Sequence, residues 1–399
     1  MKQLLAAIFC FGSLISSSQF KADNVKYKTV FPEDLCKTLK DNPGFVLLDV
    51  RSDGEYNDTL SGSPALNIGH LQNALHINIT QLPQRWKELA AYKDKPLFIY
   101  CSHSQRSRRA SRLLGDSGFT HIYNINGGLT NFYDQGIQSV PCDDYTVVST
   151  VPYKIVSAKQ LANSNGSYYI VDLREDSAFN GKTNDERIRM QGRFADAVNI
   201  PFTKLPSNGI SLPSKPVLLV DDGGGQSPIA AKMLLDKGFK DVTILFNGMD
   251  GWVSYLTNST DKPTIKWKSY SSYKMLSPDE FNKWMKENKS FTLIDVRPKD
   301  QFNSEAKNYI QNIGHIKGAV NIPYADLNTT TIPSTGAVVV YGFNSEDAVF
   351  NTARFLKGKG YSNLYVLQGG IWNLRWASHN LKNKEYLNEW VLNVPLENQ

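Results

Sequence analysis

Residues 97–107 read Leu97-Phe98-Ile99-Tyr100-Cys101-Ser102-His103-Ser104-Gln105-Arg106-Ser107, and their pattern predicts the fold class. Its first four residues are apolar, as in a buried strand, and the next ones form a polar loop that leads into a helical pattern. A strand that runs through a short loop into a helix is typical of α/β proteins. In such folds ligands bind beyond the carboxyl ends of parallel strands, so Cys101 lies where a site is expected.

The surrounding sequence continues the same alternation of strands and helices. Helical patterns cover 33–40 and 106–114, and short apolar runs that predict strands cover 45–48, 75–77, 97–100 and 122–125. Strands that alternate with helices predict a mostly parallel sheet with helices on both faces.

The pattern occurs three times in the chain. An acid followed two residues later by an arginine closes an apolar run at Asp49–Arg51, Asp172–Arg174 and Asp295–Arg297, always 123 residues apart. Each unit opens on a Tyr-Lys pair, at 27, 153 and 273, and ends near Gly127-Gly128, Asn247-Gly248 or Gly369-Gly370. A period of this length indicates duplicated whole domains rather than small repeats.

These markers predict the domain boundaries. We expect a signal peptide at 1–22, a first domain at 23–140, a second at 150–258 and a third at 270–385. The segments 138–152 and 258–272 are rich in Ser, Thr, Asp and Pro and are interpreted as linkers.

The amino-acid composition and the N-terminal segment limit the classes of function that the chain can have. The chain has 399 residues, 41% of them hydrophobic, and a net charge of +6 from scattered lysines, which argues against nucleic acid binding. The N-terminus has a basic start, an apolar run over 4–15 and small residues near 16–18, which together predict a secretory signal. We therefore expect an exported protein, periplasmic or secreted, without stable membrane insertion after the signal is removed.

Four cysteines are present, and Cys10 lies in the predicted signal. Three would remain in the exported protein, an odd number in an oxidising compartment, which suggests one free thiol. Cys36 and Cys142 could pair across the first domain, or all three thiols could be free.

The surroundings of Cys101 suggest a nucleophile. Backbone N–H groups of the turn and the positive end of the following helix both stabilise a thiolate and both bind anions. Arg106 and Arg108 add positive charge, whereas Arg109 and Arg112 could equally be a solvated helix face. The alternative is a buried structural cysteine.

The sequence resembles the rhodanese family. The resemblance rests on Asp49-Val50-Arg51, on Gly69-His70-Leu71 and on the loop from Cys101 to Ser107, and it extends over all three units. Four residues separate Cys101 from Arg106, the length that the resemblance associates with sulfurtransferases; phosphatases of this fold have a loop one residue longer. Ser104 departs from the glycine of many family loops and would be strained at a positive φ.

The resemblance implies a mechanism and roles for the loop residues. The Cys101 thiolate would take the outer sulfur of thiosulfate or a similar anionic donor and pass it from a persulfide to a thiol or cyanide. The backbone of Ser102, His103, Ser104, Gln105, Arg106 and Ser107 would hold the anion. Arg106 would orient it, and Ser107 would donate a hydrogen bond or cap the helix. Asp49 would order nearby groups, although Asp49, Arg51 and His70 have an equally plain interpretation as a buried structural network. No cofactor or metal is expected.

The other two units lack the nucleophile. Asp221 aligns with Cys101 in the second unit and Gly342 in the third, where Asp347 also replaces the arginine. We therefore expect one catalytic and two inactive domains.

Two functions other than a sulfurtransferase fit the sequence. One is a non-catalytic exported binding, scaffold or redox-sensing protein, and the other is a phosphatase or arsenate reductase, which the short loop disfavours.

Overall fold

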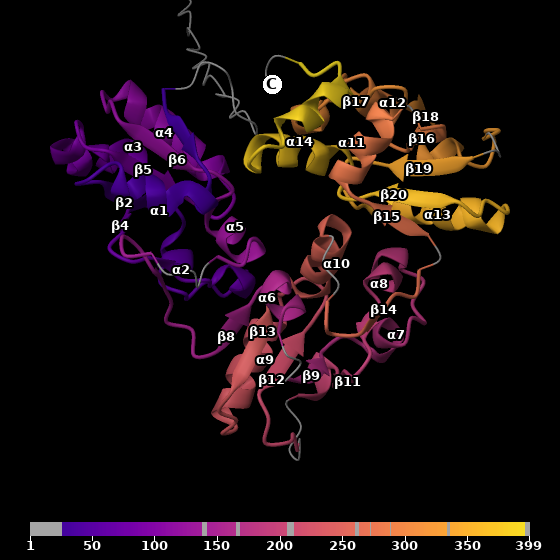
Figure 1. The fold of residues 1–399 in the computed structure, drawn as a ribbon, viewed down its shortest axis with the longest axis horizontal. Helices are drawn as coiled ribbons and strands as arrows, with labels where there is room; N and C mark the ends of the chain where they lie inside the picture. Colours follow the sequence, from indigo (N-terminus) through magenta and orange to yellow (C-terminus); the bar gives the residue numbers. More distant parts are fainter. Residues whose placement is uncertain are drawn as a thin grey trace, which may run out of the picture.

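The computed structural model describes residues 26–137, 142–164, 168–205, 211–259, 263–271, 273–287, 289–332 and 336–395. The predicted signal peptide and Cys10 lie outside these residues. Within them, three α/β domains follow one another along the chain and are arranged in a ring (Figure 1), which confirms the predicted fold class. None of the helices described is both long and apolar enough to cross a membrane.

Each domain is built on a five-stranded parallel sheet. The strand orders are β1-β6-β5-β2-β4, β11-β9-β12-β13-β8 and β15-β20-β19-β16-β18. The bounds are β1 Lys28–Val30, β2 Val46–Asp49, β4 Leu75–His76, β5 Leu97–Tyr100 and β6 Ile122–Ile125; β8 Lys154–Val156, β9 Tyr169–Asp172, β11 Val198–Asn199, β12 Val217–Val220 and β13 Val242–Leu245; β15 Lys274–Leu276, β16 Phe291–Asp295, β18 Val320–Asn321, β19 Ala337–Tyr341 and β20 Leu364–Leu367.

Helices cover both faces of each sheet. In the first domain they are α1 Pro32–Lys40, α2 Asp53–Tyr56, α3 Leu82–Arg85, α4 Gln105–Asp116 and α5 Gly128–Asp134. In the second they are α6 Ala158–Ala162, α7 Asp176–Phe179, α8 Glu186–Gln191, α9 Ser227–Asp236 and α10 Gly248–Asn258. In the third they are α11 Pro278–Lys286, α12 Lys299–Phe302, α13 Asp347–Gly358 and α14 Gly370–Asn380.

The central strand of the first sheet, β5, is buried along its whole length, which is why its sequence is uniformly apolar. Val46 to Asp49 of β2 pair in parallel with Leu97 to Tyr100 of β5, so the two strands end at the same edge. All four strands and both helices predicted for this domain are present, with boundaries that differ by at most two residues.

The two segments interpreted as linkers contribute to the domains that precede them. Each contains a short strand that pairs antiparallel with a strand of the preceding domain, and the third domain has the same closure: β3 His70–Leu71 with β7 Val147–Val148, β10 Arg193–Phe194 with β14 Trp267–Lys268, and β17 His315–Ile316 with β21 Val391–Leu392. Gly69, Gly192 and Gly314 precede these strands at positive φ, and a Cβ at any of them would collide with the partner strand's backbone. The closing strand thus belongs to the fold of each domain.

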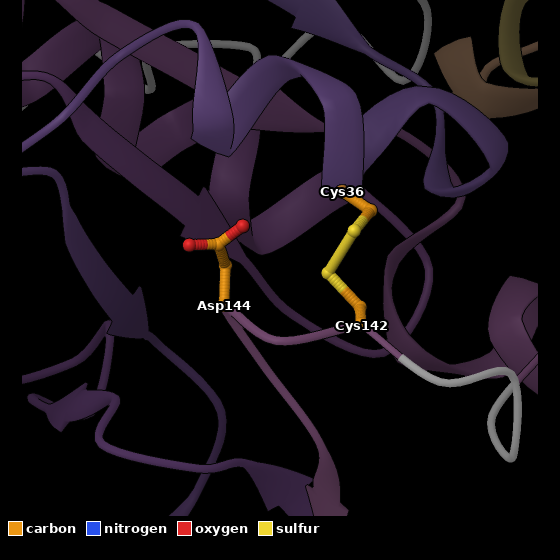
Figure 2. Close-up of side chains that lie close together, drawn as sticks. All are labelled: Cys36, Cys142 and Asp144. Carbon is orange, nitrogen blue, oxygen red and sulfur yellow. A yellow bond between two sulfur atoms is a disulfide. The ribbon is translucent and has the colours of Figure 1, made fainter.

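The first domain is further closed by a disulfide between Cys36 of α1 and Cys142, which resolves the pairing that the sequence left open (Figure 2). The two cysteines are 106 residues apart in sequence. Asp144 lies beside them, but the S–S bond occupies both thiols, so this cluster offers no set of metal ligands in its oxidised form. Cys101 is the free cysteine of the described residues.

The three domains contact one another through equivalent positions. The residue before each glycine-containing pair, namely Asn126, Phe246 or Gln368, lies against the last helix of a neighbouring domain. Phe246 packs on Tyr133 of α5, with ring centroids 4.9 Å apart. Gln368 donates to Ser254 of α10 at 2.9 Å, and Asn126 donates to the His379 carbonyl of α14 at 2.6 Å. The three helices face the middle of the ring, so the third domain also contacts the first (Figure 1).

Candidate functional site

Cys101 follows β5 at the carboxyl edge of the first sheet, and α4 begins four residues later. Its side chain is 1% exposed and carries a free thiol. The loop is held from behind by α5, whose Leu129 N–H donates to the Cys101 carbonyl at 2.8 Å. Gly128, at φ +61°, touches this backbone so closely that a Cβ would collide with it, which explains the glycine pair seen in the sequence.

Ser104 is the strained residue of the loop. It is the N-cap of α4 and has φ +81°, as the comparison with glycine suggested. Its buried Oγ accepts a hydrogen bond from the Gly127 N–H and donates to Asn126 Oδ1 at 3.2 Å. These contacts offset the strain of the left-handed conformation and attach the loop to the turn before α5.

The remaining loop residues divide between inward and outward positions. Ser107 is buried, and its Oγ donates to the Ser104 carbonyl at 3.0 Å, so it closes the first turn of α4. Ser102 is buried, whereas His103 and Gln105 are exposed at the surface of the loop. The His103 ring lies with Nδ1 2.9 Å from Ser102 Oγ.

Arg106 is engaged by a carboxylate that the sequence did not single out. Its guanidinium donates to both oxygens of Glu55, at 2.5 and 2.7 Å, and to Ser102 Oγ at 2.7 Å. Burial opposes the ionisation of Glu55, but the hydrogen bonds and charge of Arg106 outweigh it and lower the pKa of Glu55 to about 2. The ion pair fixes the direction of Arg106 and neutralises part of its charge.

Glu55 belongs to α2, where Ser52 is the N-cap. The Ser52 side chain accepts from the Glu55 N–H, and the Glu55 carboxylate accepts from the Ser52 N–H, which is a capping box. The spacing Ser52-x-x-Glu55 is visible in the sequence, yet it indicates the start of a helix and not a contact with Arg106.

Asp49 and Arg51 form a structural pair. Both side chains are fully buried, Arg51 donates to both Asp49 oxygens, and it also donates to the Gly69 carbonyl at 2.6 Å. The second and third domains repeat this arrangement with Asp172, Arg174 and Gly192, and with Asp295, Arg297 and Gly314. A network present in all three domains supports the fold. His70 also has a structural contact, because its ring stacks on that of Tyr56 with ring centroids 4.1 Å apart.

The other arginines of α4 separate into one buried and two exposed residues. Arg108 is buried and senses the charge of Cys101, whereas Arg109 and Arg112 are exposed on the outer face of the helix. Burial lowers the pKa of the Arg108 guanidinium, and the charges of Tyr27 and Cys101 act in the opposite direction. The charges of Arg106 and Arg108 thus both interact with that of Cys101.

The second domain shows what the backbone of this loop binds. Asp221, which aligns with Cys101, turns its carboxylate into its own loop and accepts hydrogen bonds from the N–H groups of Gly224, Gln226 and Ser227, at 2.5, 2.5 and 2.7 Å. Gly224 has φ +85°, nearly the conformation of the equivalent Ser104. The same three backbone positions in the first domain are Ser104, Arg106 and Ser107. The loop is thus an anion cradle, and in the second domain a side chain of the protein fills it.

The third domain is blocked in a related way. Gly342 takes the place of Cys101, and the Glu346 carboxylate accepts from the neighbouring Phe343 N–H at 3.0 Å. A Cβ on Gly342 would collide with Glu346 Oε1. Both loops without the cysteine therefore hold an internal carboxylate.

Comparison with known proteins identifies the repeated unit. The family model described as "Rhodanese-like domain" matches residues 32–135, 156–255 and 277–375, which is more than half of the chain. An uncharacterized protein, YqhL, of Bacillus subtilis is 39% identical over 82 residues, which are 21% of this chain and 56% of that protein. The tRNA uridine(34) hydroxylase of Cronobacter sakazakii is 29% identical over 123 residues, 28% of this chain and 32% of that protein.

The chain thus spans about half or less of these curated relatives. Among solved structures, a thiosulfate sulfurtransferase from Pseudomonas aeruginosa covers 86% of this chain and 66% of its own, with 18% identity and a TM-score of 0.23. A rhodanese-related protein from Thermoplasma volcanium covers 28% of this chain and 94% of its own, with 28% identity and a TM-score of 0.23. The family assignment rests on the three segments that match the family model.

Proposed function

Because the chain belongs to the rhodanese-like domain family and has three copies of the domain, we propose that it is a sulfurtransferase whose first domain acts through a persulfide on Cys101. Membership of the family supports sulfur transfer in general terms. The observation that carries the proposal is that the free, buried Cys101 begins a loop whose equivalent in the second domain binds the Asp221 carboxylate through three backbone N–H groups.

The reaction follows from the chemistry of a thiolate beside an anion cradle. The Cys101 thiolate attacks the outer sulfur of thiosulfate, a new S–S bond forms, and the old S–S bond breaks as sulfite leaves with its electron pair. A thiol or cyanide then attacks the outer sulfur of the persulfide, which forms a hydropersulfide or thiocyanate and regenerates the thiolate. The atoms and electrons balance without an added oxidant or reductant.

The residues around Cys101 have different parts in this reaction. Backbone N–H groups at Ser104, Arg106 and Ser107 stabilise the persulfide and the departing sulfite. Arg108 and the Glu55-bound Arg106 supply positive charge. A small anionic sulfur donor and a thiol or cyanide acceptor are thus the proposed substrates. Export to a periplasm or the outside is a second proposal, and the Cys36–Cys142 disulfide supports it, since disulfides persist in oxidising compartments.

The experiment compares the mature protein with Cys101→Ser for thiocyanate formation from thiosulfate and cyanide. We expect activity in the wild type and none in Cys101→Ser. Asp221→Asn alters the equivalent position of the second domain and serves as the matched control, with activity retained. Equal rates in wild type and Cys101→Ser, or no activity in either, would favour the non-catalytic binding or scaffold role instead.

A second measurement follows the intermediate itself. Thiosulfate treatment should add one sulfur, about 32 Da, to the intact protein as a persulfide. The added mass should disappear on treatment with cyanide and should not form in Cys101→Ser. A mass increase that persists in Cys101→Ser would place the acceptor sulfur elsewhere.

A further inference from the structure

The active loop of the first domain is held by the third domain. Asn126, which is fully buried, accepts hydrogen bonds at Oδ1 from Ser104 Oγ at 3.2 Å and from Arg108 Nη2 at 2.8 Å. Its Nδ2 donates to the carbonyl of His379, in the last turn of α14. One amide therefore joins the strained N-cap of α4, the buried arginine and the neighbouring domain.

A second contact reaches the same arginine. Arg108 Nη2 also donates to Oδ1 of Asn380, the last residue of α14, at 2.8 Å. Asn380 is 2% exposed and is oriented by its own Nδ2, which donates to the Trp376 carbonyl at 2.9 Å. The carboxyl end of a helix carries partial negative charge, so Arg108 lies at an end that favours a cation.

Around these contacts, the other charged groups are engaged elsewhere. Arg106 is paired with Glu55, and the Nδ1 atom of His379 faces its own helix, 2.8 Å from the Arg375 carbonyl. Lys382 pairs with Asp34 at 2.7 Å on the exposed rim of the interface. The charge of Tyr27 also acts on Arg108.

We propose that the third domain completes the sulfur-transfer site of the first, with Asn380 as a positioning residue that holds Arg108 beside Cys101 and, with the His379 carbonyl, fixes Asn126 and the loop. The inference rests on the proposed function and gives the third domain, which has no nucleophile of its own, a part in the chemistry. The contact joins residues 272 positions apart in sequence.

The pseudo-threefold arrangement provides a matched control. Asn258, the last residue of α10, is equivalent to Asn380 and donates to Gln368 of the third domain at 2.9 Å. Asn258 is exposed and acts as the donor, whereas Asn380 is buried and accepts, so the two contacts share their place at the end of the helix but not their hydrogen-bond direction. The Asn258 contact links the second and third domains, and the loop beside Gln368 has no cysteine. A change at Asn258 thus disturbs an equivalent interface without touching Arg108.

The test uses Asn380→Asp, Asn380→Ala and Asn258→Asp in the full mature chain. Asp at 380 keeps an oxygen that accepts from Arg108, but it loses the hydrogen bond that Asn380 Nδ2 donates to the Trp376 carbonyl, so a thermal unfolding curve must first show that the variant folds. The carboxylate also cancels part of the positive charge of Arg108. Iodoacetamide reacts with the thiolate, so the alkylation rate of Cys101 as a function of pH reports this charge independently of sulfur transfer.

For Asn380→Asp we expect the alkylation profile to move to higher pH, with a rate at least about threefold lower at the foot of the profile. For Asn380→Ala we expect the KM for thiosulfate to rise at least about threefold, because the loop loses one of its supports. Asn258→Asp should match the wild type in both measurements. An Asn380→Asp profile that overlays the wild type, or an equal displacement in Asn258→Asp, would overturn the inference. If the wild type forms no thiocyanate, the proposed sulfur-transfer function is wrong. The alkylation comparison still tests whether Asn380 and Arg108 influence the Cys101 thiol.

Discussion

Glu55 and Arg106 form a two-point ion pair in which Glu55 is 3% exposed, and this pair links α2 to the first turn of α4 beside Cys101. We expect Glu55→Gln to lower the free energy of unfolding at pH 7 by about 3 kcal/mol, since the pKa of Glu55 is about 2 in the folded protein and near 4.3 when unfolded. The folded value is the lower one, so the stabilisation is complete above about pH 4.3 and is lost as the pH falls toward 2.

Urea denaturation of the wild type and Glu55→Gln at pH 7 and pH 3 measures this difference. It should be largest at pH 7 and clearly smaller at pH 3. Glu88→Gln breaks the exposed two-point pair of Arg85 and Glu88 and should have no measurable effect. A Glu55→Gln deficit that is the same at both pH values would contradict the linkage.

Asp221 should be important for the stability of the second domain. Asp221→Ala leaves three backbone N–H groups without their acceptor, and we expect a loss of about 2–3 kcal/mol in the free energy of unfolding. Asp221→Asn keeps one acceptor oxygen and should lie between the wild type and Asp221→Ala. The order is checked by urea denaturation; Asp221→Ala as stable as the wild type would mean that the cradle does not depend on an anion.

The left-handed Ser104 can be separated from its hydrogen bonds by two substitutions. Both Ser104→Ala and Ser104→Gly remove the Oγ contacts with Gly127 and Asn126, but only glycine relieves the positive φ. We therefore expect Ser104→Gly to be more stable than Ser104→Ala by about 1 kcal/mol in thermal or urea unfolding. Equal stability of the two variants would show that the φ of Ser104 carries no strain.

The Cys36–Cys142 disulfide closes a loop of about a hundred residues. By the chain-entropy relation its reduction should lower the free energy of unfolding by about 5 kcal/mol. We expect dithiothreitol to destabilise the wild type by this amount and to have no further effect on Cys36→Ser/Cys142→Ser. Peptide mapping without reductant should recover the two cysteines linked and Cys101 free.

Much of the fold could be predicted because buried parallel strands have a local signature. The run 97–100 is apolar throughout and the run 122–125 is apolar except at Asn124, and both are strands with the predicted boundaries. The threefold period likewise needs only the sequence. The short closing strands, such as Val147–Val148, could not be predicted, since two residues carry no periodicity and their pairing with His70–Leu71 is non-local.

The candidate site also has a part that the sequence predicts and a part that only the structure shows. Cys101 and the strain at Ser104 follow from the order of residues in one loop. Glu55 reaches Arg106 across 51 residues and Asn380 reaches Arg108 across 272, and no local pattern records such contacts. The acid at Asp221 is visible in the sequence as the loss of the nucleophile, but only the structure shows that its carboxylate occupies the cradle.

The ring has a consequence for the order of events during synthesis. The loop that bears Cys101 is translated before the third domain, and the residues that hold Asn126 and Arg108 lie in α14 of that later domain. A chain that ends before α14 lacks the side chains that hold Asn126 and Arg108 beside the loop. We therefore expect Cys101 to reach its full reactivity only after α14 has been synthesised and has docked.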